Sequence, residues 1–203
     1  MGIAQASAAI TLGVMAFVHP ARAQIVRHGL RTKSMYSSEI RVGGTLTGCE
    51  LDFDQLLIDT TVSKPHPVFV QGTIAWMEPH PQTLVLFLKL VPREVTSGTA
   101  DEPHGPIFTP QFAYASFGNI STAGREASSF PCENGGYCAV YNDQRIFAAA
   151  ATHLSDGFRI AFQRSRGDID VESFVTVPTP DQAQWPFLAQ FGACAMALLQ
   201  SFQ

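Results

Sequence analysis

The sequence predicts a mainly β fold, an antiparallel sandwich or a strongly bent sheet, with a mid-chain helix and a C-terminal helix packed on it; an α+β fold is the alternative. Apolar and polar residues alternate in residues 68–77 and again between residues 158 and 177. Residues 84–91 form an apolar run bracketed by prolines. Successive side chains of a strand point to opposite faces, so these patterns indicate strands. Helical spacing of apolar residues occurs in two segments of the last third of the chain.

The first part of the expected domain is less regular than the rest. Residues 24–38 are polar and aperiodic, and we expect a loose arm or an edge segment there. Residues 39–48 are expected to form the first strand. Gly43 and Gly44 weaken it or mark a bulge, because glycine has no side chain to pack on a sheet.

Two stronger strands follow. In residues 68–77 one face carries an apolar set, namely Val68, Val70, Ile74 and Trp76. Residues 84–91 are apolar on both faces, which is typical of a central strand in a sheet or a sandwich core.

The middle of the chain alternates loops with short strands. Residues 92–110 are rich in Pro, Gly, Thr and acidic residues and are expected to form a long surface loop. We expect a short aromatic strand in residues 111–117, a second polar loop in residues 121–131 and a brief strand in residues 137–141.

A mid-chain helix is predicted for residues 143–154. Asn142 or Asp143 can cap it, because a short polar side chain accepts hydrogen bonds from the free N–H groups of the first turn. One face is apolar at helical spacing and consists of Ile146, Phe147, Ala150, Ala151 and Leu154. Gly157 follows as a stop signal.

The end of the chain is predicted to form a hairpin and a helix. Residues 158–162 and 169–177 alternate clearly and are joined by a turn at residues 165–168. Apolar residues then recur at helical spacing from Trp185 to Phe202. This C-terminal helix carries Cys194, and we expect it to lie across the sheet.

The N-terminal segment Met1–Ala23 is expected to be a secretory signal peptide. Residues 8–18 are an unbroken run of apolar or small residues, shorter than the roughly 20 that span a bilayer. Pro20 and the small-x-small pattern ending at Ala23 then suit cleavage before Gln24. We therefore expect a single periplasmic or secreted domain of residues 24–203, without a membrane span after cleavage. A retained N-terminal anchor is the alternative.

The chain has four cysteines, an even number that suggests two disulfides in an exported protein. Cys132 and Cys138 flank a short loop with two glycines, which favours pairing them with each other. That pairing leaves Cys49 with Cys194. A zinc site is the alternative, but the spacing lacks the paired C-x-x-C elements that zinc sites usually have.

Charge narrows the range of partners. The net charge of −4 argues against nucleic acid and against an anionic membrane as the main partner. The sequence does not identify a partner, although an edge strand could pair with another protein.

Three proline-rich turns carry a histidine each: His66, His80 and His104. Imidazoles on rigid turns can bind copper or zinc. His66 and His80 bracket one strand and therefore lie at opposite ends of it, whereas the returning strand could bring His104 towards His66. His66 and His104 are thus candidate metal ligands. Turns with no role beyond the fold are the simpler interpretation.

The aromatic residues offer a second candidate site. The chain has fifteen phenylalanines. An aromatic group beside two long loops could line a ligand pocket; its members are Phe108, Phe112, Tyr114 and Phe117. Ordinary core packing is the alternative.

The chain lacks the common catalytic motifs. It has no G-x-S-x-G element, no phosphate-binding glycine loop and no H-E-x-x-H element. Asp52 and Asp54 share a face if their segment is extended, but no pattern selects a carboxylate pair for hydrolysis. Catalytic residues therefore stay unassigned, and no cofactor is expected.

These observations favour an exported, non-enzymatic binding or envelope-accessory module. A copper- or zinc-binding exported protein and a secreted hydrolase are the two alternatives. Metal titration and a substrate panel would separate the three.

Overall fold

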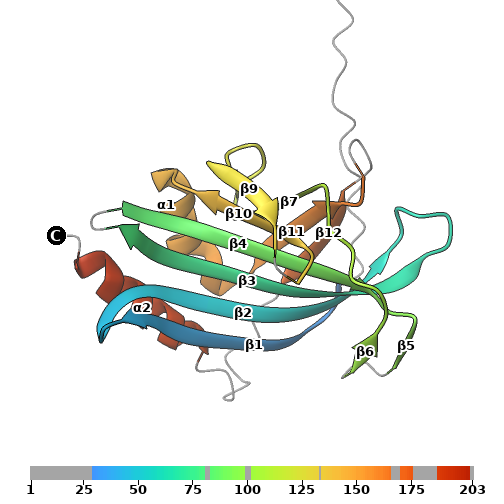
Figure 1. The fold of residues 1–203 in the computed structure, drawn as a ribbon, viewed down its shortest axis with the longest axis horizontal. Helices are drawn as coiled ribbons and strands as arrows, with labels where there is room; N and C mark the ends of the chain where they lie inside the picture. Colours follow the sequence, from blue (N-terminus) through green and yellow to red (C-terminus); the bar gives the residue numbers. More distant parts are fainter. Residues whose placement is uncertain are drawn as a thin grey trace, which may run out of the picture.

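The computed structural model describes residues 29–80, 83–98, 102–132, 134–165, 170–175 and 187–201; the expected signal segment Met1–Ala23 lies outside them. The described chain is mainly β with two helices, which confirms the predicted fold class (Figure 1). Neighbouring strands run antiparallel in every sheet.

The larger sheet has six strands in the order β1-β2-β3-β4-β10-β9. Their bounds are β1 Gly29–Val42, β2 Thr45–Asp59, β3 His66–His80, β4 Thr83–Glu94, β9 Ser128–Pro131 and β10 Tyr137–Tyr141. Strands β1 to β4 follow one another as a long, twisted meander (Figure 1). Strand β1 forms an edge of this sheet, so part of the segment expected to be an arm or an edge is an edge strand.

The smaller sheet has four strands in the order β12-β11-β7-β8. Their bounds are β7 Phe112–Phe117, β8 Ile120–Ser121, β11 Phe158–Gln163 and β12 Val171–Val175. Strands β11 and β12 pair as the predicted hairpin. The expected polar loop of residues 121–131 is instead partly paired, because it includes the end of β8 and all of β9. The long loop after β4 contains a further small hairpin, β5 Ser97–Gly98 with β6 Pro103–His104.

The two sheets bury their apolar faces in a shared core. Phe53 of β2 packs edge-on against Phe158 of β11, with ring centroids 5.1 Å apart. Both rings are almost completely buried, and the core cluster also includes residues of both helices. Removal of these apolar faces from water is the main force that holds the layers together.

The expected first strand over residues 39–48 is wrong, because that segment contains a hairpin turn. Gly43 and Gly44 have φ of 59° and 87° and connect β1 to β2. Two left-handed residues in succession make the tight turn whose twist suits antiparallel strands, and glycine adopts that conformation without strain. The two glycines therefore end one strand and begin the next.

The mid-chain helix α1 spans Gln144–His153 and continues as a 3-10 turn over Leu154–Asp156. Asp143 caps it, because its side chain accepts a hydrogen bond from the Arg145 N–H at 2.9 Å. The buried face of α1 consists of Ile146, Phe147, Ala149 and Ala150. Gly157, with φ of 92°, ends the turn before β11.

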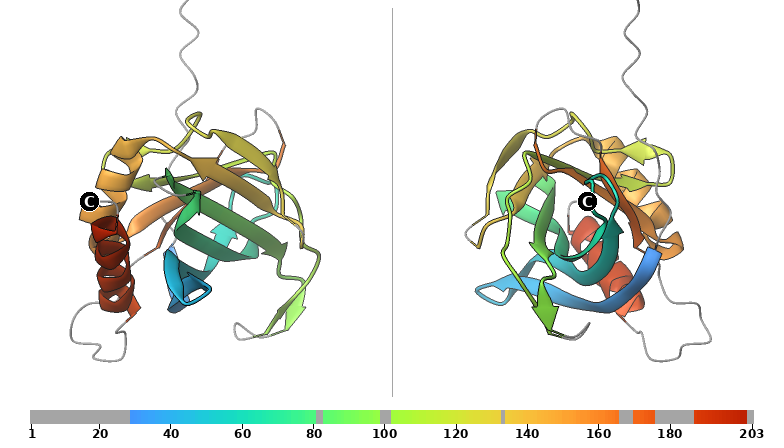
Figure 2. Two further views of the ribbon diagram at one scale, coloured as in Figure 1. Left: turned by 60° about the vertical axis from the view of Figure 1, so that its left-hand side comes forward. Right: turned by 90° about the vertical axis from the view of Figure 1, so that its right-hand side faces the viewer.

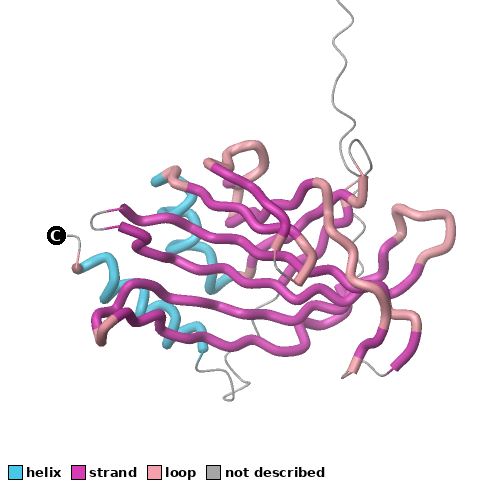
Figure 3. Tube along the Cα trace, in the orientation of Figure 1, coloured by secondary structure: helices cyan, strands magenta, loops and turns pink. Residues whose placement is uncertain are grey.

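The C-terminal helix α2 spans Phe187–Gln200 and lies against β1 and β2. Disulfides join Cys49 to Cys194 and Cys132 to Cys138, the pairs that the sequence favours. Both helices lie at the same end of the long strands (Figure 3). Figure 2 shows the two helices side by side. Neither described helix is long and apolar enough to cross a membrane.

Candidate ligand-binding groove

Trp76 is the centre of the helix-bearing end of the larger sheet. It lies on β3 between Cys49 of β2 and Leu86 of β4, and only 1% of its surface is exposed. The indole packs edge-on against Phe147 of α1 and against Phe191 of α2, with centroid distances of 6.0 Å in both cases. One side chain of the sheet therefore contacts both helices.

Two adjoining cavities border Trp76. The wider has a volume of about 550 Å³ and is lined by Trp76, Thr83, Leu84, Asn142, Gln144, Phe147, Ala148, Ala151 and Leu199. The narrower has a volume of about 150 Å³ and is lined by Trp76, Ala150, Ala151, Leu154, Phe191, Gly192, Ala195, Met196 and Leu199. They share Trp76, Ala151 and Leu199, and we call them together the Trp76 groove.

The Trp76 groove has a polar and an apolar part. Thr83, Asn142 and Gln144 belong to the wider cavity alone, whereas the narrower one is lined by apolar side chains and a glycine apart from the indole itself. None of the described side chains that line the two cavities is ionisable. A largely apolar concave site with a few polar groups is the usual form of a small-molecule site.

Trp76, which lines both cavities, also carries an unpaired buried donor. Its Nε1 atom is buried and has no hydrogen-bond partner among the described residues. A buried polar group without a partner costs about 1–3 kcal/mol, and buried tryptophans usually find one.

Small side chains on the two helices leave the space open. Ala148 and Ala151 lie along α1, and Gly192 lies on α2, where an added Cβ would meet no described atom beyond the neighbouring helix backbone within 4 Å. Helix α2 is held in place covalently, because Cys194 is bonded to Cys49 beside Trp76. The walls of the groove are therefore fixed while its interior is not filled.

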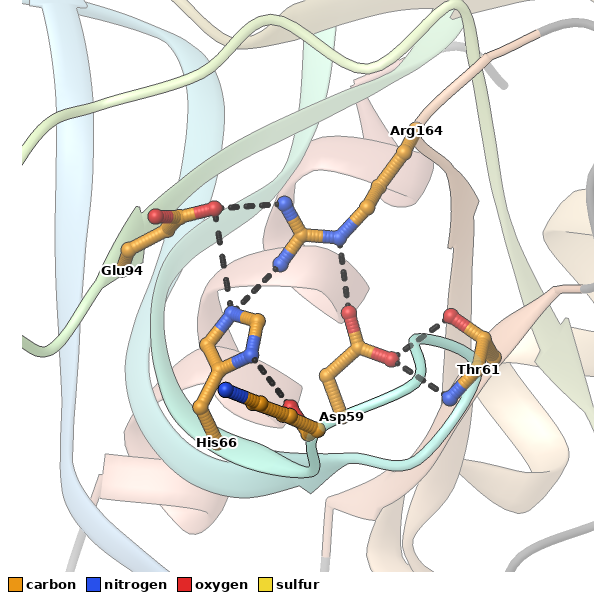
Figure 4. Close-up of polar contacts among 6 residues, drawn as sticks. Asp59, Thr61, His66, Glu94 and Arg164 are labelled. Atoms are coloured by element: carbon orange, nitrogen blue, oxygen red, sulfur yellow. Dashed lines mark hydrogen bonds and ion pairs between the residues drawn. The ribbon is translucent and has the colours of Figure 1, made fainter.

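The other end of β3 has a different chemistry (Figure 4). Arg164, which follows β11, donates from Nε to Asp59 Oδ2 and from Nη1 to Glu94 Oε1, both at 2.7 Å. Its Nη2 lies 3.0 Å from Nε2 of His66. Asp59 is fully buried and also accepts two hydrogen bonds from Thr61, at 2.6 and 2.8 Å. We call this set the Arg164 network.

Every charged group in the Arg164 network has a partner. The guanidinium also lies over the ring of Phe108, 4.2 Å from its centroid. Burial alone would raise the pKa of Asp59, but the hydrogen bonds from Thr61 and Arg164 outweigh it and hold that pKa below its ordinary value. A buried charge of this kind is stable only when it is paired.

His66, one of the two candidate metal ligands, belongs to the Arg164 network. Its Nδ1 lies 3.2 Å from the backbone carbonyl of Lys64, which can only accept, so Nδ1 carries the proton and Nε2 faces Arg164 as an acceptor. His104 lies on β6, in the small hairpin beyond β4, and is exposed. Across the described ranges, no group of three or more His, Cys, Asp or Glu side chains could hold a metal ion.

The four candidate pocket aromatics do not gather in one place. Phe117 is fully buried and contacts Phe158, and Phe108 packs on Phe162. Phe112 and Tyr114 belong to the opposite face of β7, because side chains alternate along a strand. None of the four lines the Trp76 groove.

Tyr114 belongs to a polar cluster of its own. Its hydroxyl donates to Asp170 at 2.8 Å and lies 3.1 Å from Glu172. Burial, together with these two carboxylates, raises the pKa of Tyr114. A tyrosine held in this way is a hydrogen-bond donor rather than part of an apolar pocket.

The outer face of the larger sheet bears a second, polar groove of about 530 Å³. Asp52 and Asp54 of β2 line it together with Lys89 and Arg93 of β4. Thr73 donates to Asp52 at 2.6 Å. The predicted sharing of a face by Asp52 and Asp54 is therefore observed.

A scan against protein-family models and searches of curated proteins and of solved structures found no match to this chain. Its function therefore has to be argued from the geometry of the sites.

Sequence reasoning placed Trp76 on the core face of its strand but did not single it out as a site residue. The indole N–H is left unpaired by the way three separate elements pack around it, and no local sequence pattern reveals that packing. A usable signal was present in the helices, where Ala148, Ala151 and Gly192 put small side chains beside apolar positions.

Proposed function

We propose that this chain is an exported, non-enzymatic binding protein, periplasmic or secreted, that holds a small and largely apolar ligand in the Trp76 groove. The observation that carries the proposal is the pair of adjoining cavities lined by Trp76, a residue whose buried indole N–H has no partner among the described residues. Native proteins rarely leave such a donor unpaired without a reason.

The covalent framework supports the exported part of the proposal. All four cysteines are paired, and structural disulfides persist mainly in oxidising compartments. The same framework supports binding, because a tethered helix keeps the groove wall in position without a ligand and lowers the cost of ordering on binding.

A fluorescence titration with the uncharged probe N-phenyl-1-naphthylamine tests the binding role. We expect saturable binding to the purified oxidised chain with micromolar affinity. Gly192→Leu should weaken it by at least tenfold, because Gly192 lines the narrower cavity and a leucine there would take up part of its space. The matched control is Gly192→Ala, which adds a single methyl group at the same position and should bind nearly normally.

Two results would remove the proposal. One is the absence of saturable binding to folded wild-type protein. The other is equal binding by wild type and Gly192→Leu, since the probe would then lie elsewhere.

The carboxylates on the outer face of β2 favour a second candidate function, the secreted hydrolase. Burial and the charge of Asp52 raise the pKa of Glu50, which follows the same alternation along β2. Alternate residues of a strand are about 6.6 Å apart, close to the carboxyl separation of about 6.5–9.5 Å in inverting glycosidases. A carboxyl with a raised pKa beside a second carboxyl could serve as the acid of an acid–base pair.

A panel of aryl glycosides tests this alternative. The hydrolase hypothesis expects turnover that falls by at least a hundredfold in Asp52→Asn and in Glu50→Gln. Absence of turnover across the panel, with folded enzyme, leaves the binding role as the function that the geometry supports.

A further inference from the structure

We infer that the polar groove on the outer face of the larger sheet binds a small zwitterion, a molecule with an ammonium group at one end and a carboxylate or phosphate group at the other. The site lies on the opposite face of the sheet from the Trp76 groove. Thr73 and Trp76 are three residues apart on β3, and side chains alternate along a strand. The inference therefore concerns a second site and does not rest on the proposed function.

One row of side chains crosses the outer face of four neighbouring strands. Tyr36 of β1 lies opposite Asp52 of β2. Asp52 in turn lies opposite Thr73 of β3, and Thr73 lies opposite Lys89 of β4. Residues paired in this way have their side chains on the same face, and all four line the groove of about 530 Å³. The row therefore leads from an aromatic ring and a carboxylate at one side of the groove to a cation at the other.

The charged side chains of the groove are separated by sign. Asp52 and Asp54 belong to β2, whereas Lys89 and Arg93 belong to β4. The residues that β3 contributes between them are uncharged. All four charged residues are partly buried, so salt screens them less than it screens fully exposed groups. A ligand with one charge would be attracted by one side and repelled by the other, whereas a zwitterion can pair with both.

The β2 side of the groove suits an ammonium group. Thr73 donates to Asp52 at 2.6 Å, and Ser34 donates to Asp54. Each carboxylate has further lone pairs and can accept from a second donor. Tyr36, which is 57% exposed, adds an aromatic ring to the lining beside them. An ammonium group is stabilised both by carboxylates and by the face of an aromatic ring.

The β4 side suits an anionic group. Lys89 makes no hydrogen bond and no ion pair with a described residue, although it is partly buried. Arg93 donates from Nη1 to the backbone carbonyl of Gly105 at 2.8 Å, which holds the guanidinium in place. A guanidinium has five N–H donors, so one such bond leaves capacity for a ligand. Carboxylates and phosphates form their strongest hydrogen bonds with donors of these two kinds.

The shape of the groove sets the distance between the two charges of the ligand. Loops border the β4 side, where Ile107 forms a bridge with Arg93 and Asn134 belongs to the loop closed by the Cys132–Cys138 disulfide. Neighbouring strands are about 4.8 Å apart, so β2 and β4 are separated by about 10 Å. A ligand whose charges are several ångströms apart can therefore reach both sides, whereas a more compact zwitterion cannot.

A matched series of six-carbon ligands tests the inference. At pH 7, 6-aminohexanoate carries both charges, hexanoate carries only the negative one and hexylamine only the positive one. Each is titrated at low ionic strength into the ¹⁵N-labelled oxidised chain, and binding is followed by the backbone N–H signals of Thr73 and Lys89. We expect 6-aminohexanoate to bind at least tenfold more tightly than either singly charged ligand. Free glycine, whose charges are too close together, should also bind at least tenfold more weakly.

Two substitutions test the two sides separately. Lys89→Met keeps the apolar stem and removes the cation, so it should weaken 6-aminohexanoate at least fivefold without weakening hexylamine. Asp52→Asn should weaken 6-aminohexanoate at least fivefold without weakening hexanoate. The matched control is Lys64→Met, which removes the same charge from an exposed position outside the groove and should leave 6-aminohexanoate binding unchanged. Melting curves establish that each variant is folded.

Three results would overturn the inference. They are equal binding of 6-aminohexanoate and a singly charged ligand, no saturable binding of 6-aminohexanoate to folded wild type, and equal binding of 6-aminohexanoate by wild type and Lys89→Met. None of them bears on the proposed function, which is measured with N-phenyl-1-naphthylamine on the other face of the sheet. Loss of naphthylamine binding would likewise leave the zwitterion site standing.

Discussion

The two ends of strand β3 differ in whether their buried polar groups have hydrogen-bond partners. At the His66 end, Arg164 donates hydrogen bonds to Asp59 and Glu94 and faces His66, and Asp59 is further bonded to Thr61. At the other end, Trp76 lies among apolar rings and its donor has no partner in the described chain. The first end holds charged side chains whose hydrogen bonds are all made. The second end holds an unpaired donor and has open cavities beside Trp76.

This difference separates a structural role from a binding role. A paired network stabilises the fold only when all of its members are present, and it leaves no free donor or acceptor for a ligand. The groove beside Trp76 makes the opposite arrangement, since its open space can take up a ligand. Changes at the Arg164 network should therefore reduce stability without altering the groove, and changes in the groove should alter binding with little loss of stability.

The largest expected effect is on the disulfide that tethers α2. Replacing Cys49 and Cys194 together by alanine should lower the free energy of unfolding by about 5 kcal/mol, because the loop it closes spans 145 residues. Replacing Cys132 and Cys138, which are 6 residues apart, should cost about 2 kcal/mol on the same chain-entropy argument. Urea denaturation of both double variants measures the difference. Equal losses would show that loop entropy is not the main contribution.

The next effect concerns the Arg164 network. Arg164→Met should destabilise the chain by about 3–5 kcal/mol, because it leaves the fully buried Asp59 without its cation. The affinity of the folded variant for N-phenyl-1-naphthylamine should stay within twofold of wild type. Adding Asp59→Asn should recover part of the lost stability. A large change in affinity without a change in stability would contradict the separation of the two ends.

The pH dependence of stability follows from the same carboxylate. The pKa of Asp59 is lowered in the folded state, so its ionised form contributes stability that is complete above the unfolded value of about 3.9. That contribution is lost as the pH falls through the lower folded pKa. The difference in unfolding free energy between wild type and Asp59→Asn should therefore shrink between pH 6 and pH 3. A difference that stays constant would mean that Asp59 titrates normally.

The smallest expected effect is on stability at Gly192, in the Trp76 groove. Gly192→Ala should stabilise the protein by about 0.5–1 kcal/mol, since glycine inside a helix is that much less favourable than alanine and the added methyl group meets no atom. Thermal melts of wild type and variant measure it. Destabilisation would show that the space beside Gly192 is occupied in the protein.

The fold was largely predictable because its strongest signals are local. Alternation located β3 and the β11–β12 hairpin, an apolar run between prolines located β4, and helical spacing with Asp143 as cap located α1. The Gly43–Gly44 turn was misread as a weak point of one strand, since glycine pairs occur both in bulges and in hairpins. The short strands β8 and β9 owe their pairing to neighbours rather than to their own residues.

The sites were less predictable because they join distant parts of the chain. Arg164 meets Asp59 across 105 residues and Glu94 across 70, and nothing in either local sequence marks the pairing. The aromatic residues of β7 were grouped by their closeness in sequence, but alternation divides Phe117 from Phe112 and Tyr114. The metal site at His66 and His104 stays a prediction, which copper or zinc titration would test.

The most direct test of the central claim is the resonance of the Trp76 indole N–H in ¹H–¹⁵N spectra of the oxidised chain. The chain has two tryptophans, and Trp185→Phe identifies the signal of Trp76. On saturation with N-phenyl-1-naphthylamine, the Trp76 signal should shift, because Trp76 lines both parts of the groove and an aromatic probe seated there changes the field at the indole, and it should not shift in Gly192→Leu. A Trp76 signal that stays in place while the ligand is demonstrably bound would contradict the account.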